Sequence, residues 1–200
     1  DIGTSFDVYH EKEFLGQFTI PLYGNHMVLN SLACIIVCIY LGVNTQDIQR
    51  LFSNFKNAAR RFSLKTFGDI VTIDDYAHHP TEIKVTLEAA RAKYPDKKLI
   101  AVFKPNTYSR TAAFTKEFAD SLKIADKVFM TEIDCNREKQ EDYPGITSSL
   151  VLKDIPDGEI IGEDDVDKLL KYQNAVICFM SCASISHIKD KYESLLESTK

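Results

Sequence analysis

The stretch TIDDYAHHPTEI, residues 72–83, places side chains that could do chemistry directly after an apolar run. Asp74, Asp75, His78 and His79 could bind a metal ion, exchange protons with a substrate, or simply shape a loop. Known zinc spacings give little support for a metal, because adjacent histidines point in different directions and neither HxH nor HxxxH occurs. We expect no resident metal here, and ligand contact by the four side chains stays open.

Pro80, Thr81 and Glu82 have a simpler interpretation as the first turn of a helix. Proline is favoured at the first helical position, and a glutamate suits the positive end of the helix dipole. That interpretation explains these three residues without a function, but it leaves the aspartates and histidines before them unexplained.

Two further stretches carry cations. In FKPNTYSRT, residues 103–111, Arg110 stands where a helix is expected to begin, and a guanidinium beside unpaired helical amides makes an anion site. A solvated arginine is the alternative, although a helix start disfavours a cation that has no anionic partner. In ARRF, residues 59–62, Arg60 and Arg61 could reach a phosphate or could be surface charge between two domains.

The elements that would position these residues alternate between strand and helix. Apolar, β-branched runs predict strands at 70–74, 99–103, 127–133, 159–162 and 175–180, and helical patterns lie between and after them at 80–94, 111–124, 147–152, 164–172 and 184–196. This alternation predicts a doubly wound α/β domain with a mostly parallel sheet covered on both faces. Ligands bind beyond the carboxyl ends of such strands, where the loops at 74–80, 104–110, 132–138 and 181–184 are expected.

Residues 1–60 read differently. Strands are expected within 5–22 around a turn at 10–13, then a helix to about Leu41, then a second helix capped by Thr45 with Ile48, Leu51, Phe52 and Phe55 on one face. We interpret this part as the end of another domain.

The composition excludes several classes of protein. The net charge is -5 without a basic block, which argues against nucleic-acid binding. The apolar run at 27–41 is shorter than the about 20 residues that a membrane span needs. Five cysteines without a CxxC pair, and no leader sequence, favour reduced thiols in the cytoplasm. The first residue is Asp1, which suggests that a region lies upstream.

Four segments together resemble the Mur ligases: YGNHMVLNSLA (23–33), RRF (60–62), DDYAHHPTEI (74–83) and FKPNTYSRT (103–111), in that order and spacing. The resemblance runs through the whole chain, and DDYAHHP is its most specific motif. It implies that residues 1–60 are the last part of a central ATP-binding domain and that residues 61–200 are a Rossmann-like C-terminal ligase domain.

The resemblance also implies an activity. Mur ligases use ATP and Mg²⁺ to make an acyl phosphate, which an amine converts to an amide. The motif DDYAHHP resembles that of the family member that adds L-alanine to UDP-N-acetylmuramate in peptidoglycan synthesis. Asn30 resembles the residue that meets adenine, Arg61 the one that reaches the ATP phosphates, and Asp75 the one that binds ribose. His78, His79 and Arg110 resemble substrate-binding residues, and we expect His78 and Arg110 to act in catalysis.

The chain departs from the family at several positions. Lys104-Pro105-Asn106 replaces Gln-Pro-His, residues 181–184 (SCAS) replace Gly-Ala-Gly-Asp, and Met27 replaces Asn. We expect the side chains of Ser181 and Ala183 to narrow the final loop. No GxxxxGK[ST] motif occurs, and the magnesium ligands are expected upstream, so we predict that these 200 residues alone do not turn over ATP.

Two other functions remain open from the residues alone. One is a nucleotide or nucleotide-sugar binding module without catalysis. The other is a metal-dependent hydrolase that uses Asp74, Asp75, His78 and His79.

Overall fold

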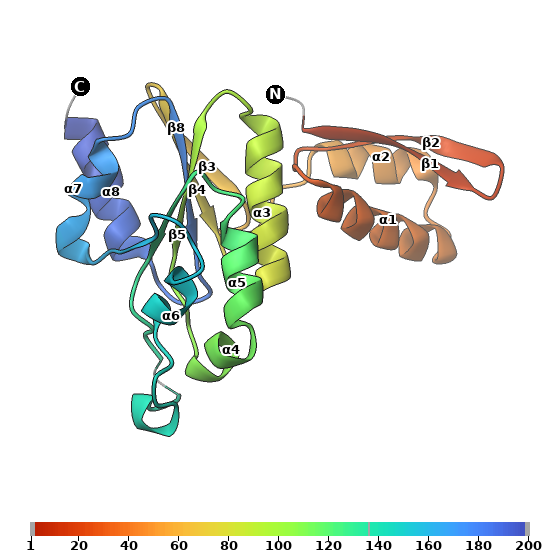
Figure 1. The fold of residues 1–200 in the computed structure, drawn as a ribbon. Helices are drawn as coiled ribbons and strands as arrows, with labels where there is room; N and C mark the ends of the chain where they lie inside the picture. The colour runs from red at the N-terminus through yellow and green to blue at the C-terminus, as the bar shows by residue number, and fades with distance from the viewer. Residues whose placement is uncertain (1–2, 136, 199–200) are drawn as a thin grey trace. The chain divides into compact units, whose positions relative to one another are not determined.

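The computed structural model describes residues 3–135 and 137–198 and consists of two compact units. The first unit ends at Ala59 and the second begins at Arg60. Each unit has its own apolar core. Figure 1 shows the helices and strands of both units. Their assignment to a central and a C-terminal ligase domain stays a prediction.

The first unit is a hairpin with two helices. Strands β1 (Thr4–His10) and β2 (Glu13–Ile20) are antiparallel, and α1 (Asn25–Tyr40) and α2 (Thr45–Ser53) follow. Val8, Phe18, Ile35 and Ile48 form the core.

The predicted details of α2 are partly wrong. Asn44, not Thr45, caps the helix, because its side chain accepts a hydrogen bond from the Asp47 amide at 2.8 Å. Ile48 is buried as expected, but Leu51 is exposed, and Phe55 lies beyond the end of the helix and is also exposed.

The second unit is built on a six-stranded sheet in the order β3-β4-β8-β5-β6-β7. Strands β4 (Ile70–Asp75), β8 (Ala175–Met180), β5 (Lys98–Phe103), β6 (Lys127–Met130) and β7 (Glu159–Ile160) run parallel, and β3 (Ser63–Phe67) is antiparallel to β4. The predicted mostly parallel sheet is confirmed. Strand β3 was missed because its side chains are largely exposed and give little apolar pattern.

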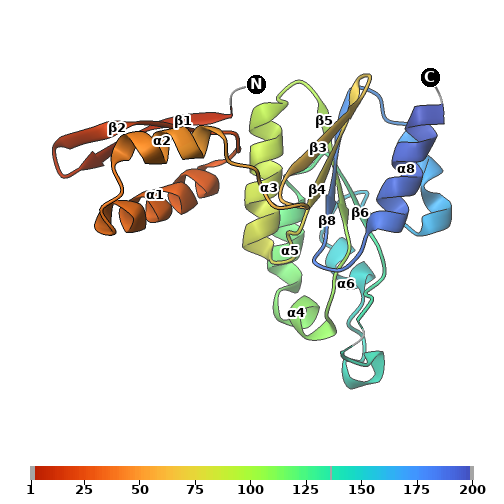
Figure 2. The ribbon, with the colours of Figure 1, turned by 180° about the vertical axis from the view of Figure 1, so that it is seen from behind.

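Helices cover both faces of this sheet (Figures 1 and 2). On one side α3 (Pro80–Lys93), α5 (Thr115–Leu122) and α6 (Ser148–Leu152) share an apolar cluster with the strands. On the other side α7 (Asp167–Leu170) and α8 (Ser186–Ser198) share a second cluster. The doubly wound α/β prediction is therefore correct.

One helix prediction is wrong in its extent. The segment expected as a single helix at 111–124 forms two, α4 (Tyr108–Ala113) and α5, because Phe114 leaves helical geometry at φ -127° and ψ 27°. Short 3-10 turns lie at Gln140–Asp142 and Glu163–Asp165. Among the described residues, no helix combines the length and apolar character needed to cross a membrane.

Candidate functional site

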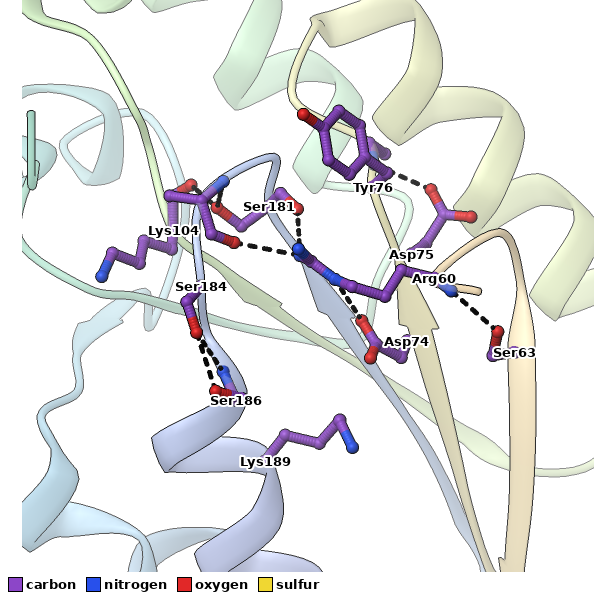
Figure 3. Close-up of polar contacts among 12 residues, drawn as sticks. Arg60, Ser63, Asp74, Asp75, Tyr76, Lys104, Ser181, Ser184, Ser186 and Lys189 are labelled. Carbon is purple, nitrogen blue, oxygen red and sulfur yellow. Dashed lines mark hydrogen bonds and ion pairs between the residues drawn. The ribbon is translucent and has the colours of Figure 1, made fainter. Parts of the chain in front are cut away.

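The carboxyl ends of four neighbouring parallel strands bring the candidate residues of the second unit to one edge of the sheet. Strands β4, β8, β5 and β6 are adjacent in that order. Strand β4 ends at Asp75. The first residues after β8, β5 and β6 are Ser181, Lys104 and Thr131, respectively. We call the loops at 74–80, 104–110 and 181–184 the rim. Figure 3 shows how part of the rim is tied together.

Asp75 is the most enclosed of the predicted ligand-binding residues. Its side chain is buried, and its Oδ1 accepts hydrogen bonds from the Ala77 amide (2.8 Å) and the Thr86 hydroxyl (3.3 Å). Its Oδ2 accepts from the Phe62 amide at 2.7 Å. Burial raises the pKa of this carboxyl, and the donors from Ala77, Phe62 and Thr86 oppose that rise. The geometry makes Asp75 an organiser of the rim, and contact with a ribose stays a prediction.

His78 and His79 occupy different positions. The His78 ring lies against Tyr76, with Nδ1 at 2.9 Å from the Tyr76 carbonyl oxygen. A carbonyl can only accept, so this contact assigns a proton to Nδ1 and leaves the lone pair of a neutral ring on Nε2. His79 instead caps α3, because its Nδ1 accepts from the Thr81 amide at 3.3 Å.

Glu82 completes the start of α3. Its Oε2 accepts from the backbone amides of His78 (2.9 Å) and His79 (3.0 Å). The interpretation of Pro80, Thr81 and Glu82 as a helix first turn is therefore correct, since Pro80 is the first residue of α3 and Glu82 closes a capping box. His79 therefore has a capping role, the His78 ring also lies near Glu82 with Nδ1 at 3.2 Å from Oε2, and substrate contact by either ring stays a prediction.

The two adjacent arginines have different surroundings. Arg60 donates from Nε to Asp74 at 3.3 Å and from Nη2 to the carbonyl oxygens of Ser181 and Ala183. Arg61 is exposed and lies over the ring of Tyr76, 5.1 Å from its centroid. The guanidinium of Arg60 also lies over that ring, at 5.4 Å.

The backbone at this junction is unusual. Arg60 and Phe62 have φ angles of 58° and 53°, in the left-handed region that costs a non-glycine residue roughly 1–2 kcal/mol. Hydrogen bonds hold both conformations: the Arg60 amide donates to the Ser63 hydroxyl, the Tyr76 amide donates to the Arg60 carbonyl, and the Phe62 amide donates to Asp75. Backbone strain that is held in this way is common at functional sites.

The final loop is tied rather than narrowed. Ser181 is fully buried, and its hydroxyl donates to the Lys104 carbonyl at 2.9 Å and accepts from the Ala183 amide at 3.1 Å. None of residues 181–184 is among the described residues with a positive φ. The expectation that the Ser181 side chain narrows this loop is wrong, because that side chain is buried and joins two loops, whereas the same expectation for Ala183 stays a prediction.

Lys104 is buried along its stem, and its Nζ pairs with Asp134 at 2.8 Å, after the end of β6. This hydrogen bond and the charge of Lys104 hold the pKa of Asp134 below its ordinary value. Lys104 therefore links the loop after β5 to the loop after β6.

The prediction of unpaired amides beside Arg110 is wrong for the amide of Ser109. Arg110 is the third residue of α4, and the amide and hydroxyl of Ser109 before it donate to the carboxylate of Glu138. These bonds hold the pKa of Glu138 below its ordinary value, with a smaller contribution from the charge of Arg110. The chain itself therefore supplies the anion at this helix start, and a substrate role for Arg110 stays a prediction.

Asn30 lies in the first unit, beside a cavity of about 160 Å³. Apolar residues dominate the lining: Ile20, Leu22, Met27, Phe52 and Phe55, with Asn30, Ser31 and Cys34 from α1. An apolar slot with one amide at its edge suits a flat, hydrogen-bonding ring such as a nucleobase.

No three His, Cys, Asp or Glu side chains converge as a possible metal site within residues 3–135 and 137–198. Asp74 accepts a hydrogen bond from Arg60, and His79 accepts one from the Thr81 amide. Asp75 accepts three hydrogen bonds from groups of the chain itself. The described side chains therefore do not fit Mg²⁺, and no step is assigned to a metal held by them.

Sequence reasoning did not single out several residues that lie in the rim or contact it. The sequence does not decide whether Arg60 contacts a phosphate or is surface charge, and it does not identify the partners of Tyr76, Thr86 and Glu138. The sequence shows that Arg60 and Arg61 are adjacent, but it does not show that Arg60 contacts the carbonyl oxygen of Ser181.

Comparisons with known proteins agree with this geometry. A family described as "Mur ligase, glutamate ligase domain" matches residues 60–180. The UDP-N-acetylmuramate–L-alanine ligase of Levilactobacillus brevis is 47% identical over 196 residues, which are 97% of this chain and 44% of that enzyme. The enzyme of the same name from Lactiplantibacillus plantarum is 49% identical over 197 residues, 98% of this chain and 44% of its own length.

A solved structure is similar as well. The crystal structure of a UDP-N-acetylmuramate-alanine ligase from Thermotoga maritima matches with a TM-score of 0.74 at 25% identity, over 92% of this chain and 41% of that one. The present chain thus spans less than half the length of the curated relatives that it matches.

Proposed function

The chain belongs to the Mur ligase family, and on this premise we propose that it supplies the ligase domain for joining L-alanine to UDP-N-acetylmuramate with ATP, in cytoplasmic peptidoglycan synthesis. The observation that carries the proposal is the extent of the likeness. Relatives named for this reaction are 47% and 49% identical across nearly all of the chain, through both units.

The reaction has two steps. A carboxylate oxygen of the muramate attacks the γ-phosphorus of ATP, and ADP leaves with the bond electrons. The amine of L-alanine then attacks the acyl carbon, phosphate leaves with the former carboxylate oxygen, and the amine loses a proton. Both steps place negative charge on oxygen, so fixed cations and hydrogen-bond donors should accelerate them.

We assign roles to the side chains accordingly. Asn30 and its apolar cavity would hold the adenine, and Arg61 would meet the phosphates. His78, which presents Nε2 as described above, and Arg110 would position the muramate and the amino acid. Asp75 would order the rim between them and, in the role that the family resemblance implies, contact the ribose.

ATP turnover is expected only in a longer polypeptide. These 200 residues contain no GxxxxGK[ST] loop to hold the phosphates, and the described residues do not fit Mg²⁺. The alternative function is binding of a nucleotide or nucleotide sugar without catalysis. The absence of a GxxxxGK[ST] loop from these 200 residues favours it.

A chimera can distinguish these functions. This chain would replace the matching residues of the Levilactobacillus brevis ligase, and phosphate release would be measured with ATP, Mg²⁺, UDP-N-acetylmuramate and L-alanine. We expect release only when all four are present, and none from the 200-residue chain alone. A chimera that binds UDP-N-acetylmuramate but releases no phosphate would support the binding module instead. Release without L-alanine would contradict the ligase.

A further inference from the structure

Arg60 makes more contacts than a surface cation between two domains requires. Its guanidinium reaches Asp74 at the end of β4 and the Ser181 carbonyl oxygen (Figure 3). It also reaches the Ala183 carbonyl oxygen in the same β8–α8 loop, at 3.0 Å. Ser181 and Ala183 lie more than 120 positions after Arg60 in the sequence. One side chain thus holds two rim loops at a fixed separation.

The β8–α8 loop is fully engaged by this arrangement. The Ser181 amide donates to the Asp75 carbonyl at 3.1 Å, and the Ser181 carbonyl accepts from Arg60. The Ser181 hydroxyl joins the loop to Lys104, as described above. The family resemblance implies glycines at positions 181 and 183, which would leave this loop adaptable, whereas here Arg60 and Ser181 hold it through hydrogen bonds.

Arg61 lies between two residues that are held in left-handed conformations. The carbonyl of Arg60 accepts from Tyr76, and the amide of Phe62 donates to Asp75. Both flanking residues are therefore bound to the end of β4, and the Arg61 guanidinium is held over the Tyr76 ring. Such pre-organisation lowers the entropy that a cation must lose when it meets an anion.

We propose that Arg60 is a positioning residue, whose contacts with Asp74 and the β8–α8 loop set the backbone that presents Arg61 to a phosphate group. The identity of this anion, a nucleoside triphosphate, rests on the proposed function. The contacts of Arg60 do not depend on that function and can be tested separately.

Arg91 provides a matched control. Its guanidinium binds one aspartate, Asp126 at 2.8 Å, and two carbonyl oxygens, at Lys97 and Ile124. Its side chain is 34% exposed, against 31% for Arg60. Arg91 lies at the opposite end of the sheet, where β5 and β6 begin, so its loss should lower stability without touching the rim.

Amide hydrogen exchange in the 200-residue chain tests the positioning. Arg60→Ala removes the hydrogen bonds of the guanidinium to Asp74, Ser181 and Ala183. The backbone that these bonds hold should then open more often, so exchange at the Phe62, Tyr76 and Ser181 amides should be roughly 10-fold faster relative to the sheet core. Arg60→Lys should resemble Arg60→Ala, because one ammonium cannot reach Asp74 and two carbonyls together. Arg91→Ala should leave these three amides unchanged. Equal effects from Arg60→Ala and Arg91→Ala, or none from Arg60→Ala, would overturn the proposal.

Kinetics of the chimera test the consequence for Arg61. Arg60→Ala should raise the KM for ATP about 10-fold and leave the KM for L-alanine within about 2-fold, whereas Arg91→Ala should change neither. An equal rise in both KM values would mean general damage and would refute the presentation of Arg61. If the unmodified chimera has no activity, the proposed function fails, and the exchange data still decide whether Arg60 positions the rim.

Discussion

Replacing Asp75 by asparagine should separate an internal organiser from a ligand-binding carboxylate. In the native chain the two oxygens accept three hydrogen bonds from Ala77, Thr86 and Phe62. Asparagine keeps one oxygen, which can still serve Ala77 and Thr86, but it turns an NH₂ group towards the Phe62 amide. A charge-assisted bond is lost, and two donors face each other in a buried place.

The expected cost follows from these contacts. Losing a hydrogen bond to a charged group costs about 1.5–3 kcal/mol, and a buried donor without a partner costs about 1–3 kcal/mol. Partial relaxation brings the expected loss to about 2–3 kcal/mol, which corresponds to a fall in Tm of roughly 5–10 °C for a unit of this size.

Urea unfolding and circular dichroism melting of the 200-residue chain provide the assay, with Asp74→Asn as the control. Asp74 accepts one bond, from Arg60 Nε at 3.3 Å, which an asparagine oxygen can also accept, so that variant should lose less than about 1 kcal/mol. A loss below about 0.5 kcal/mol for Asp75→Asn would refute the role of Asp75 as an organiser. If such a stable variant also raised the KM for ATP in the chimera, direct contact with the nucleotide would be favoured.

Three further substitutions test separate contacts that the rim loops make. Ser181→Ala should lower the free energy of unfolding by about 1–2 kcal/mol in urea titrations, because the Lys104 carbonyl and the Ala183 amide lose their partner in a buried place; an unchanged midpoint would contradict this. Glu82→Ala should cost about 1 kcal/mol and speed amide exchange in the first turn of α3, and unchanged exchange at His78 and His79 would count against the capping box. Glu138→Gln should alter the acid dependence of stability, because the pKa of Glu138 is lowered by Ser109 in the folded chain. The stability that Glu138 contributes is therefore present above its ordinary pKa and is lost as the pH falls through the lowered folded value, so the gap in Tm between native chain and variant should close below about pH 4, and a gap that does not depend on pH would contradict this.

The alternation of strands and helices was predictable because each buried parallel strand is a continuous apolar run. The run at Ala175–Met180 is buried along its whole length, and its bounds were predicted without error. The exposed strand β3 and the break at Phe114 were not predictable in this way, since neither leaves an apolar signature.

The candidate site was predictable to a different degree. Parallel strands end at one edge, so the gathering of the rim loops followed from the order of elements. The partners within the rim did not follow. The contacts of Arg60 with Ser181 and of Ser109 with Glu138 join segments that are distant in sequence, and only packing brings them together. The three hydrogen-bond donors to Asp75 could not be predicted, because they are two backbone amides and a hydroxyl that no sequence motif identifies.

The central claim, that this chain supplies the ligase domain for amide formation through an acyl phosphate, is tested most directly by isotope transfer in the chimera. UDP-N-acetylmuramate labelled with ¹⁸O in its carboxylate would be supplied with ATP, Mg²⁺ and L-alanine, and the released phosphate would be analysed by mass spectrometry. We expect one ¹⁸O atom in each phosphate released from fully labelled substrate, because the carboxylate oxygen that attacks phosphorus leaves with it. Phosphate without the label, or no phosphate at all, would contradict amide formation through an acyl phosphate.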